Sequence, residues 1–217
     1  MNKIKYQDVR KILNGISNIK TGDIDKISKM LIKNKTDVSD LRDYVLKDSL
    51  VHRIYFQVSM RLLSNNEERL IFIEKNLSLL SDWWHVDQLI QFFDKPLDFE
   101  MIYKFSSKYI NSKDIFTRRI SYVLFISGLQ KDRENAIKIL GLLKNDDEYM
   151  VCMAEAWLLC ELAIYNFDLV MKYLDNCDLK YNITGKAIQK MCDSFRLTSK
   201  QKLIAKSKRS KLKNSGV

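Results

Sequence analysis

The chain has 217 residues, 46% of them hydrophobic and 29% charged, which is ordinary for a globular protein. It contains one proline and six glycines, too few turn breakers for a β-sandwich or barrel, so a helical chain is favoured. Charged residues interrupt any apolar run before residue 10, so we expect no signal peptide. The most apolar run, residues 150–164, contains Glu155 and Glu161 and is too short to cross a bilayer.

Apolar residues recur at helical spacing along almost the whole chain, and short polar turns separate the segments. In the first half the predicted helices span residues 3–16, 24–31, 38–48, 50–63, 67–79 and 82–93, before Pro96. In the second half they span residues 98–110, 113–129, 133–143, 149–164, 167–174 and 183–195, followed by a basic helix from Ser199.

These helices number about thirteen and come in pairs with a loose period of roughly 35 to 40 residues. One pair cannot bury its own apolar face, so neighbouring pairs are expected to stack. The pattern predicts an all-α fold over residues 1–199, an α-solenoid of stacked antiparallel helix pairs (HEAT-like repeats) with a concave groove. A compact helical bundle is the alternative, but so many short helices stack more readily than they bundle.

The formal net charge of +10 is concentrated at the C-terminal end of the chain. Seven Lys and Arg residues and no acid lie between Lys200 and Lys213, which leaves +3 for residues 1–199. We therefore treat residues 200–217 as a basic, frayed tail. It either binds phosphates without sequence preference or is a solvated terminus that aids solubility.

The cysteine and histidine pattern predicts neither a disulfide nor a metal site. Cys152 and Cys160 fall on one predicted helix and lie about 12 Å apart along it, too far to bridge. With Cys177 and Cys192 they contain no CxxC pair, and His52 and His85 are the only histidines. We expect reduced, buried thiols in a cytoplasmic protein, with no metal and no cofactor.

The segment from Ser81 to Ile90 is the first candidate site. Ser81 or Asp82 can cap a helix there, on which Trp83, Asp87 and Gln91 form a stripe at i, i+4 and i+8, with Trp84 beside it. An indole face attracts cations and a carboxylate adds negative charge, so this surface suits an electron-poor, positively charged ring. The alternative is that the tryptophans pack and that Asp87 only complements the helix dipole.

Arg119 and Trp157 are two further candidate residues, because packing is only one of their possible roles. Arg119 lies among apolar neighbours on its helix, whereas Arg118 points elsewhere. A buried guanidinium needs a partner, which is either an internal carboxylate or a phosphate at the rim of a cleft. Trp157 is the one large aromatic side chain in an otherwise smooth apolar run, and core packing is its alternative role.

Together these segments resemble the AlkD family of DNA alkylation-repair proteins, over about residues 65 to 195. The matching strings, in family order and at similar intervals, are WWHVD at 83–87, RR at 118–119 after DIF at 114–116, AEAWLLCE at 154–161 and KAI at 186–188. No single string is specific to the family, and the ordered set carries the resemblance.

The resemblance implies a HEAT-like-repeat glycosylase that hydrolyses the N-glycosidic bond of cationic N3- or N7-alkylpurines in duplex DNA. Asp87 then matches the catalytic carboxylate, and Trp83 and Trp157 match aromatic residues of the lesion cleft, with Trp84 beside them. Arg119 matches a phosphate-binding arginine, and we expect Arg118 beside it to bind phosphate as well. No metal or cofactor is implied, and we expect a monomer that takes double-stranded DNA as its partner.

The chain also departs from the family pattern. Near the N-terminus, residues 13–22 lack the aromatic residue and the proline of the segment that approaches DNA. Around Trp157, Met153 and Cys160 replace basic residues that are common in the family. The chain thus resembles the branch without the N-terminal recognition element and without evident glycosylase function. Three hypotheses remain: a glycosylase, a non-catalytic nucleic-acid-binding homologue, and a protein-binding scaffold.

Overall fold

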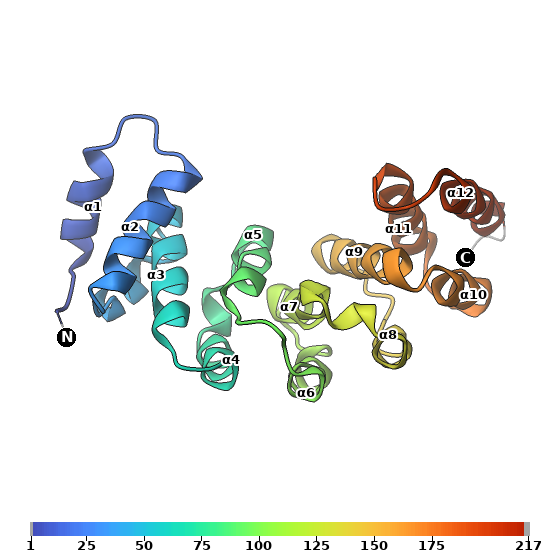
Figure 1. Ribbon diagram of the computed structural model, residues 1–217, viewed down its shortest axis with the longest axis horizontal. Helices are drawn as coiled ribbons and strands as arrows, with labels where there is room; N and C mark the ends of the chain where they lie inside the picture. The colour runs from blue at the N-terminus through green and yellow to red at the C-terminus, as the bar shows by residue number, and fades with distance from the viewer. Residues whose placement is uncertain (1, 215–217) are drawn as a thin grey trace. The chain divides into compact units, whose positions relative to one another are not determined.

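The computed structural model describes residues 2–214, and the secondary structure of this range is all-helical (Figure 1). It contains twelve α-helices and five short 3-10 helices, which agrees with the predicted α-solenoid of helical repeats. The chain divides into two compact units, residues 1–95 and residues 96–217. No helix in the described range is long and apolar enough to cross a membrane.

Unit 1 is built around helix α3. Its elements are α1 (Tyr6–Asn14), α2 (Thr21–Lys33), η1 (Ser39–Tyr44), α3 (Ser49–Leu62), α4 (Asn66–Lys75), η2 (Leu77–Leu79), α5 (Trp83–Asp87) and η3 (Leu89–Phe92). Helix α3 packs against α2, η1 and η3, and its side chains Val51, Ile54, Phe56 and Val58 are fully buried. Asp48 caps α3 by accepting the backbone N–H groups of Leu50 and Val51.

Unit 2 is built around helix α9. Its elements are α6 (Phe99–Tyr109), α7 (Ile115–Val123), η4 (Leu124–Ser127), η5 (Leu129–Lys131), α8 (Arg133–Leu140), α9 (Tyr149–Tyr165), α10 (Phe167–Asn176), α11 (Tyr181–Asp193) and α12 (Ser199–Asn214). Helix α9 contacts α7, α10 and α11, which explains why its sequence is apolar on nearly every side.

The carboxylate inside the apolar run of α9 holds the loop that leads into the helix. Glu155 is fully buried and accepts the backbone N–H groups of Lys144 (2.8 Å), Asn145 (3.1 Å) and Asp146 (3.2 Å). Burial raises the pKa of this carboxyl, and the three hydrogen bonds act in the opposite direction. Glu155 therefore serves the structure of the loop.

Three predicted helices are interrupted by a change from α-helix to 3-10 helix. Residues 67–79 divide at Asn76, whose side-chain amide donates to the carbonyl of Phe72 and whose Oδ1 accepts from Arg42. Residues 82–93 divide at Gln88, and residues 113–129 leave the α-helix after Val123. Within the predicted helix at residues 38–48, Ser39–Tyr44 form the 3-10 helix η1 and there is no α-helix.

The expectation of a frayed tail from residue 200 was wrong up to residue 214, because Ser199–Asn214 forms α12 and packs on α11. Ala205 of α12 is fully buried. The four cysteines are free, as expected, but only Cys152 and Cys160 are buried, and Cys177 and Cys192 are half-buried.

Candidate functional site

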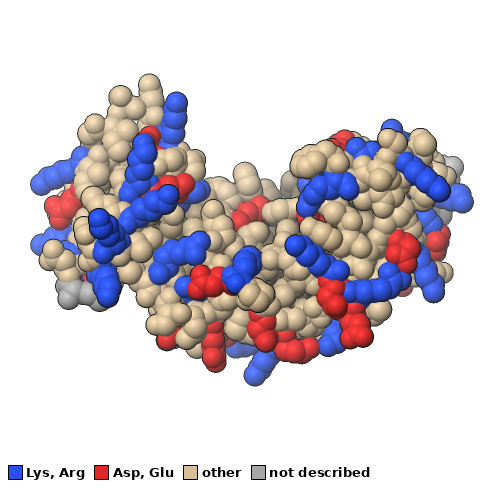
Figure 2. Space-filling model, in the orientation of Figure 1, with Lys and Arg blue, Asp and Glu red and all other residues tan. Residues whose placement is uncertain are grey.

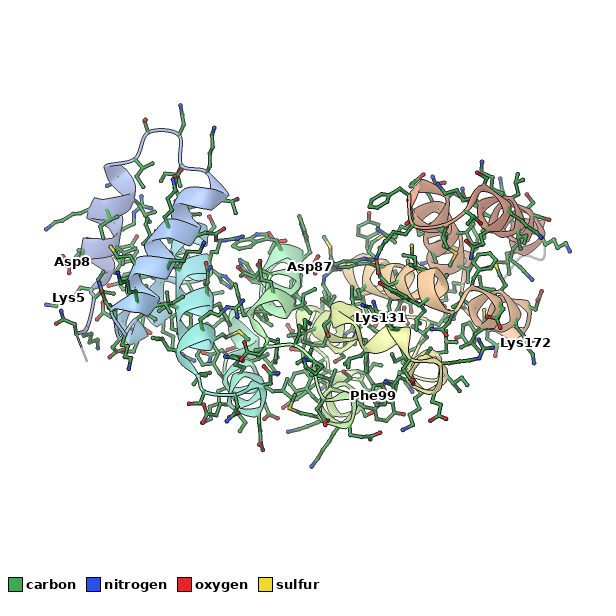
Figure 3. All side chains as sticks on the ribbon, in the orientation of Figure 1. Lys5, Asp8, Asp87, Phe99, Lys131 and Lys172 are labelled. Carbon is green, nitrogen blue, oxygen red and sulfur yellow. The ribbon has the colours of Figure 1, made fainter. Side chains whose placement is uncertain are left out.

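In unit 1 the candidate residues lie on the five-residue helix α5. Asp82 caps this helix by accepting the Trp83 backbone N–H at 2.7 Å. Of the two predicted capping residues, Ser81 and Asp82, it is therefore Asp82 that caps α5. The Trp83 side chain is 49% exposed, and Asp87 is half-buried at the other end of α5 (Figure 3). Because positions i and i+4 share one face of a helix, the indole and the carboxylate lie on the same side.

The predicted stripe does not continue to Gln91. Helix α5 ends at Asp87, and the chain continues from Leu89 as a 3-10 helix, which turns through a different angle per residue. Among the apolar residues of this segment, Val86, Leu89 and Phe93 are buried, whereas Ile90 is only half-buried. The candidate surface is therefore one helical turn long.

Trp84 lies against two buried histidines. The rings of His52 and His85 are stacked with centroids 3.5 Å apart and an interplanar angle of 12°. The half-buried Trp84 indole meets both rings edge-on, at 5.2 Å from His52 and 4.1 Å from His85. These contacts indicate that packing is a large part of the role of Trp84. They also tie α5 to His52 of α3.

Both histidines are neutral, and their partners assign the tautomers. His52 Nε2 faces the carbonyl of Leu79 at 3.2 Å, so it carries the proton, and Nδ1 accepts from Gln88 Nε2 at 3.1 Å. His85 Nδ1 accepts the backbone N–H of Ser81 at 3.1 Å. Burial lowers the pKa of His52 to about 3 and that of His85 to about 4.

In unit 2 the two neighbouring arginines of α7 have different surroundings. Arg118 Nε and Nη2 donate to the carboxylate of Asp146, at 2.6 and 3.2 Å, and Nη1 donates to the carbonyl of Ser112 at 2.8 Å. A phosphate would have to compete with Asp146 for this guanidinium. Arg119 is 5% exposed, and its Nη1 donates to the carbonyl of Met150, in the first turn of α9.

Trp157 is half-buried on α9, and its indole N–H points at a charged pair. Nε1 donates to Oε1 of Glu161 at 3.4 Å, one helical turn further along. Glu161 is 6% exposed and forms a fork with Arg196, whose Nη1 lies 3.0 Å from Oε2 and whose Nη2 donates to Oε1. The ring of Trp157 is thus linked to the turn between α11 and α12.

The structure brings Trp83, Trp84 and Asp87 together in unit 1, and it places Arg118, Arg119 and Trp157 on the two packed helices α7 and α9 of unit 2. Sequence reasoning missed three groups that support these residues. Two of them left a signal: His52 is one of only two histidines, and Glu161 lies at i+4 from Trp157. Arg196 left no signal, because its pairing depends on the packing of α11 and α12.

In the described part of the chain, no group of His, Cys, Asp or Glu residues is arranged to hold a metal ion. The chemistry available at α5 is that of a carboxylate beside an indole. Such a pair can stabilise positive charge on a bound ring or sugar.

Comparison with known proteins gives one match. The sequence model of the family described as DNA alkylation repair enzyme matches residues 11–191, a range that contains all six candidate residues. No curated protein and no solved structure matches the chain significantly.

Proposed function

This chain belongs to the family of DNA alkylation repair enzymes, and we propose that it excises cationic N3- or N7-alkylpurines from duplex DNA by hydrolysing the N-glycosidic bond. The observation that supports excision is the arrangement on α5, where the half-buried carboxylate of Asp87 lies one helical turn from the exposed indole of Trp83. The proposal takes the protein to act as a monomer and to need no cofactor.

The mechanism follows from the charge of the substrate. A purine alkylated at N3 or N7 is already positive, so its glycosidic bond is weak and breaks toward an oxocarbenium-like sugar. In the proposed mechanism the Asp87 carboxylate stabilises that developing charge and orients the attacking water. The indole of Trp83 adds a cation–π contact to the base or sugar, which strengthens as positive charge develops.

The other candidates receive binding roles in the proposal. Trp157 contacts the lesion nucleotide, and Trp84 supports the α5 surface through its contacts with the histidine pair. Arg119 contacts a phosphate. Arg118 does so only by exchanging Asp146 for a phosphate oxygen.

The test is base release by the wild-type protein. Duplex DNA carrying 7-methylguanine or 3-methyladenine is incubated with the full chain, and the free base is separated and quantified against a buffer control. Release well above the spontaneous rate supports the proposal. Release at the buffer rate, from protein shown by circular dichroism to be helical, rejects excision of these two bases.

The second candidate function is duplex binding without excision, and helix α12 favours it. The cations of α12 differ in their partners. Lys208 pairs with Asp175, and Arg209 donates to Gln189, whereas four exposed lysines form no ion pair in the described residues. The exposed lysines are Lys200, Lys206, Lys211 and Lys213. Figure 2 shows blue side chains over this end of unit 2.

Replacing those four lysines by glutamine is expected to flatten the salt dependence of duplex binding. Each phosphate contact adds about 0.9 to the slope of log K against log salt, so the slope should fall by about 2 to 4. The measurement is fluorescence anisotropy with an unmodified duplex across a salt series. A matched variant replaces exposed Lys26, Lys29, Lys33 and Lys35 of unit 1. An equal fall in both variants would contradict a specific role of α12.

A further inference from the structure

We propose that Arg196 is a positioning residue that fixes the indole ring of Trp157 through the carboxylate of Glu161. The inference rests on the proposed function only in taking Trp157 to contact the substrate. The arrangement of side chains stands on the geometry of unit 2 alone.

The first support is the carboxylate that Trp157 and Arg196 share. Glu161 is 6% exposed, and a carboxylate buried to that degree is costly unless a positive partner faces it. Arg196 supplies both Nη atoms in a fork, the strongest geometry for such a pair. Oε1 of the same carboxylate also accepts the Trp157 indole N–H. The fork therefore fixes the acceptor on which the indole depends.

The second support is the geometry of the indole. An indole ring rotates over a broad, roughly two-fold χ2 profile, so packing on one side leaves its tilt open. Trp157 is only half-buried, so packing covers part of the side chain and leaves the rest exposed. The hydrogen bond from Nε1 to Glu161 is long, at 3.4 Å, but it selects the one tilt of the ring that points Nε1 at this carboxylate. An aromatic surface held in one tilt loses less entropy when a base or sugar contacts it.

The third support is the rigidity of the turn that carries Arg196, between α11 and α12 (Figure 1). The Arg196 backbone N–H donates to Ser194 Oγ at 3.2 Å, and Leu197 is 5% exposed. Thr198 and Gln201 cap α12 reciprocally, since each backbone N–H donates to the other side chain. Hydrogen bonds thus hold the backbone on both sides of Arg196.

The experiment observes Trp157 directly, without DNA. In a Trp83→Phe/Trp84→Phe background, Trp157 is the only tryptophan, so emission wavelength and acrylamide quenching report its surroundings. Arg196→Gln is expected to shift the emission to longer wavelength and to increase quenching. Glu161→Gln keeps a carbonyl acceptor for the indole, so it should give a smaller shift in the same direction. Arg196→Lys keeps the charge without the fork and should lie between wild type and Arg196→Gln.

The matched control is Arg133→Gln. Arg133 forms a similar fork with Asp168, at 3.0 and 2.7 Å, but that pair is exposed. If Arg196 only stabilises the fold, Arg196→Gln should lower the free energy of unfolding and leave Trp157 emission the same as in Arg133→Gln. That outcome would overturn the proposal. If Arg196→Gln fails to fold, Glu161→Gln and Arg196→Lys decide instead: a shift to longer wavelength in both supports the proposal, and emission as in Arg133→Gln in both overturns it.

Activity separates this inference from the proposed function. With intact Trp83 and Trp84, Arg196→Gln should raise KM for methylated duplex by up to about tenfold, as expected for a displaced aromatic contact, with a smaller change in kcat. A fluorescence shift in a protein whose wild type releases no base supports the arrangement of Trp157 and rejects only the glycosylase activity. Base release by the wild type, with identical Trp157 fluorescence in all variants, supports the glycosylase activity and rejects the positioning role of Arg196.

Discussion

Asp87→Asn is expected to lower the release of alkylpurines by at least about a hundredfold while leaving the helical content unchanged. The substitution removes the negative charge that the developing oxocarbenium sugar requires, and it leaves the size of the side chain almost the same. Losing one preorganised electrostatic group in an active site typically costs a factor of about 100 to 1,000 in rate. The measurement is single-turnover base release, compared with circular dichroism of the same preparation.

The chain offers a close control for this variant. Asp82 lies at the start of the same helix and accepts one backbone N–H, a role that asparagine fills equally well. Asp82→Asn removes the same charge from the same short helix, so it should release base at nearly the wild-type rate. If both variants lose activity equally, the local charge matters and Asp87 has no specific catalytic role. If Asp87→Asn keeps full activity, the assignment is wrong.

Helical periodicity predicted most elements of this fold because apolar spacing directly reflects which side of each helix is buried. It failed where an α-helix changes to a 3-10 helix although the apolar pattern continues. Gln88 is such a case: it is 6% exposed and donates to His52, and the chain leaves the α-helix at that residue. The apolar residues that follow stay largely buried, so nothing in the pattern marks the change to a 3-10 helix.

The candidate site shows a similar limit. The sequence predicted that Arg119 needs a partner, and the structure supplies the Met150 carbonyl as an acceptor. It also predicted a phosphate contact for Arg118, whose donors the structure directs at Asp146. The pairing of Arg118 with Asp146 spans 28 residues, and no local pattern identifies such a partner. Long-range pairing is therefore what the sequence alone cannot provide.

Acid is expected to destabilise unit 1 through the histidine pair, with a loss that begins below pH 6.5. Burial lowers the pKa of His52 to about 3 and of His85 to about 4, whereas in the unfolded chain both titrate near 6.5. Between pH 6.5 and 4 the unfolded chain therefore binds protons that the folded chain does not. The free energy of unfolding falls with falling pH, by up to about 1.4 kcal/mol per pH unit for each histidine.

The measurement is urea unfolding at several pH values between 7 and 4, followed by tryptophan fluorescence in a Trp157→Phe background, so that only unit 1 reports. His52→Gln/His85→Gln contains no histidine, and glutamine can both donate and accept where the imidazoles do. Carboxylates still titrate in this variant, so its remaining pH dependence is subtracted. The difference between the two proteins should amount to several kcal/mol at pH 4. Parallel curves would contradict the idea that these buried, neutral rings limit the stability of unit 1, because any shared slope would then come from acidic groups alone.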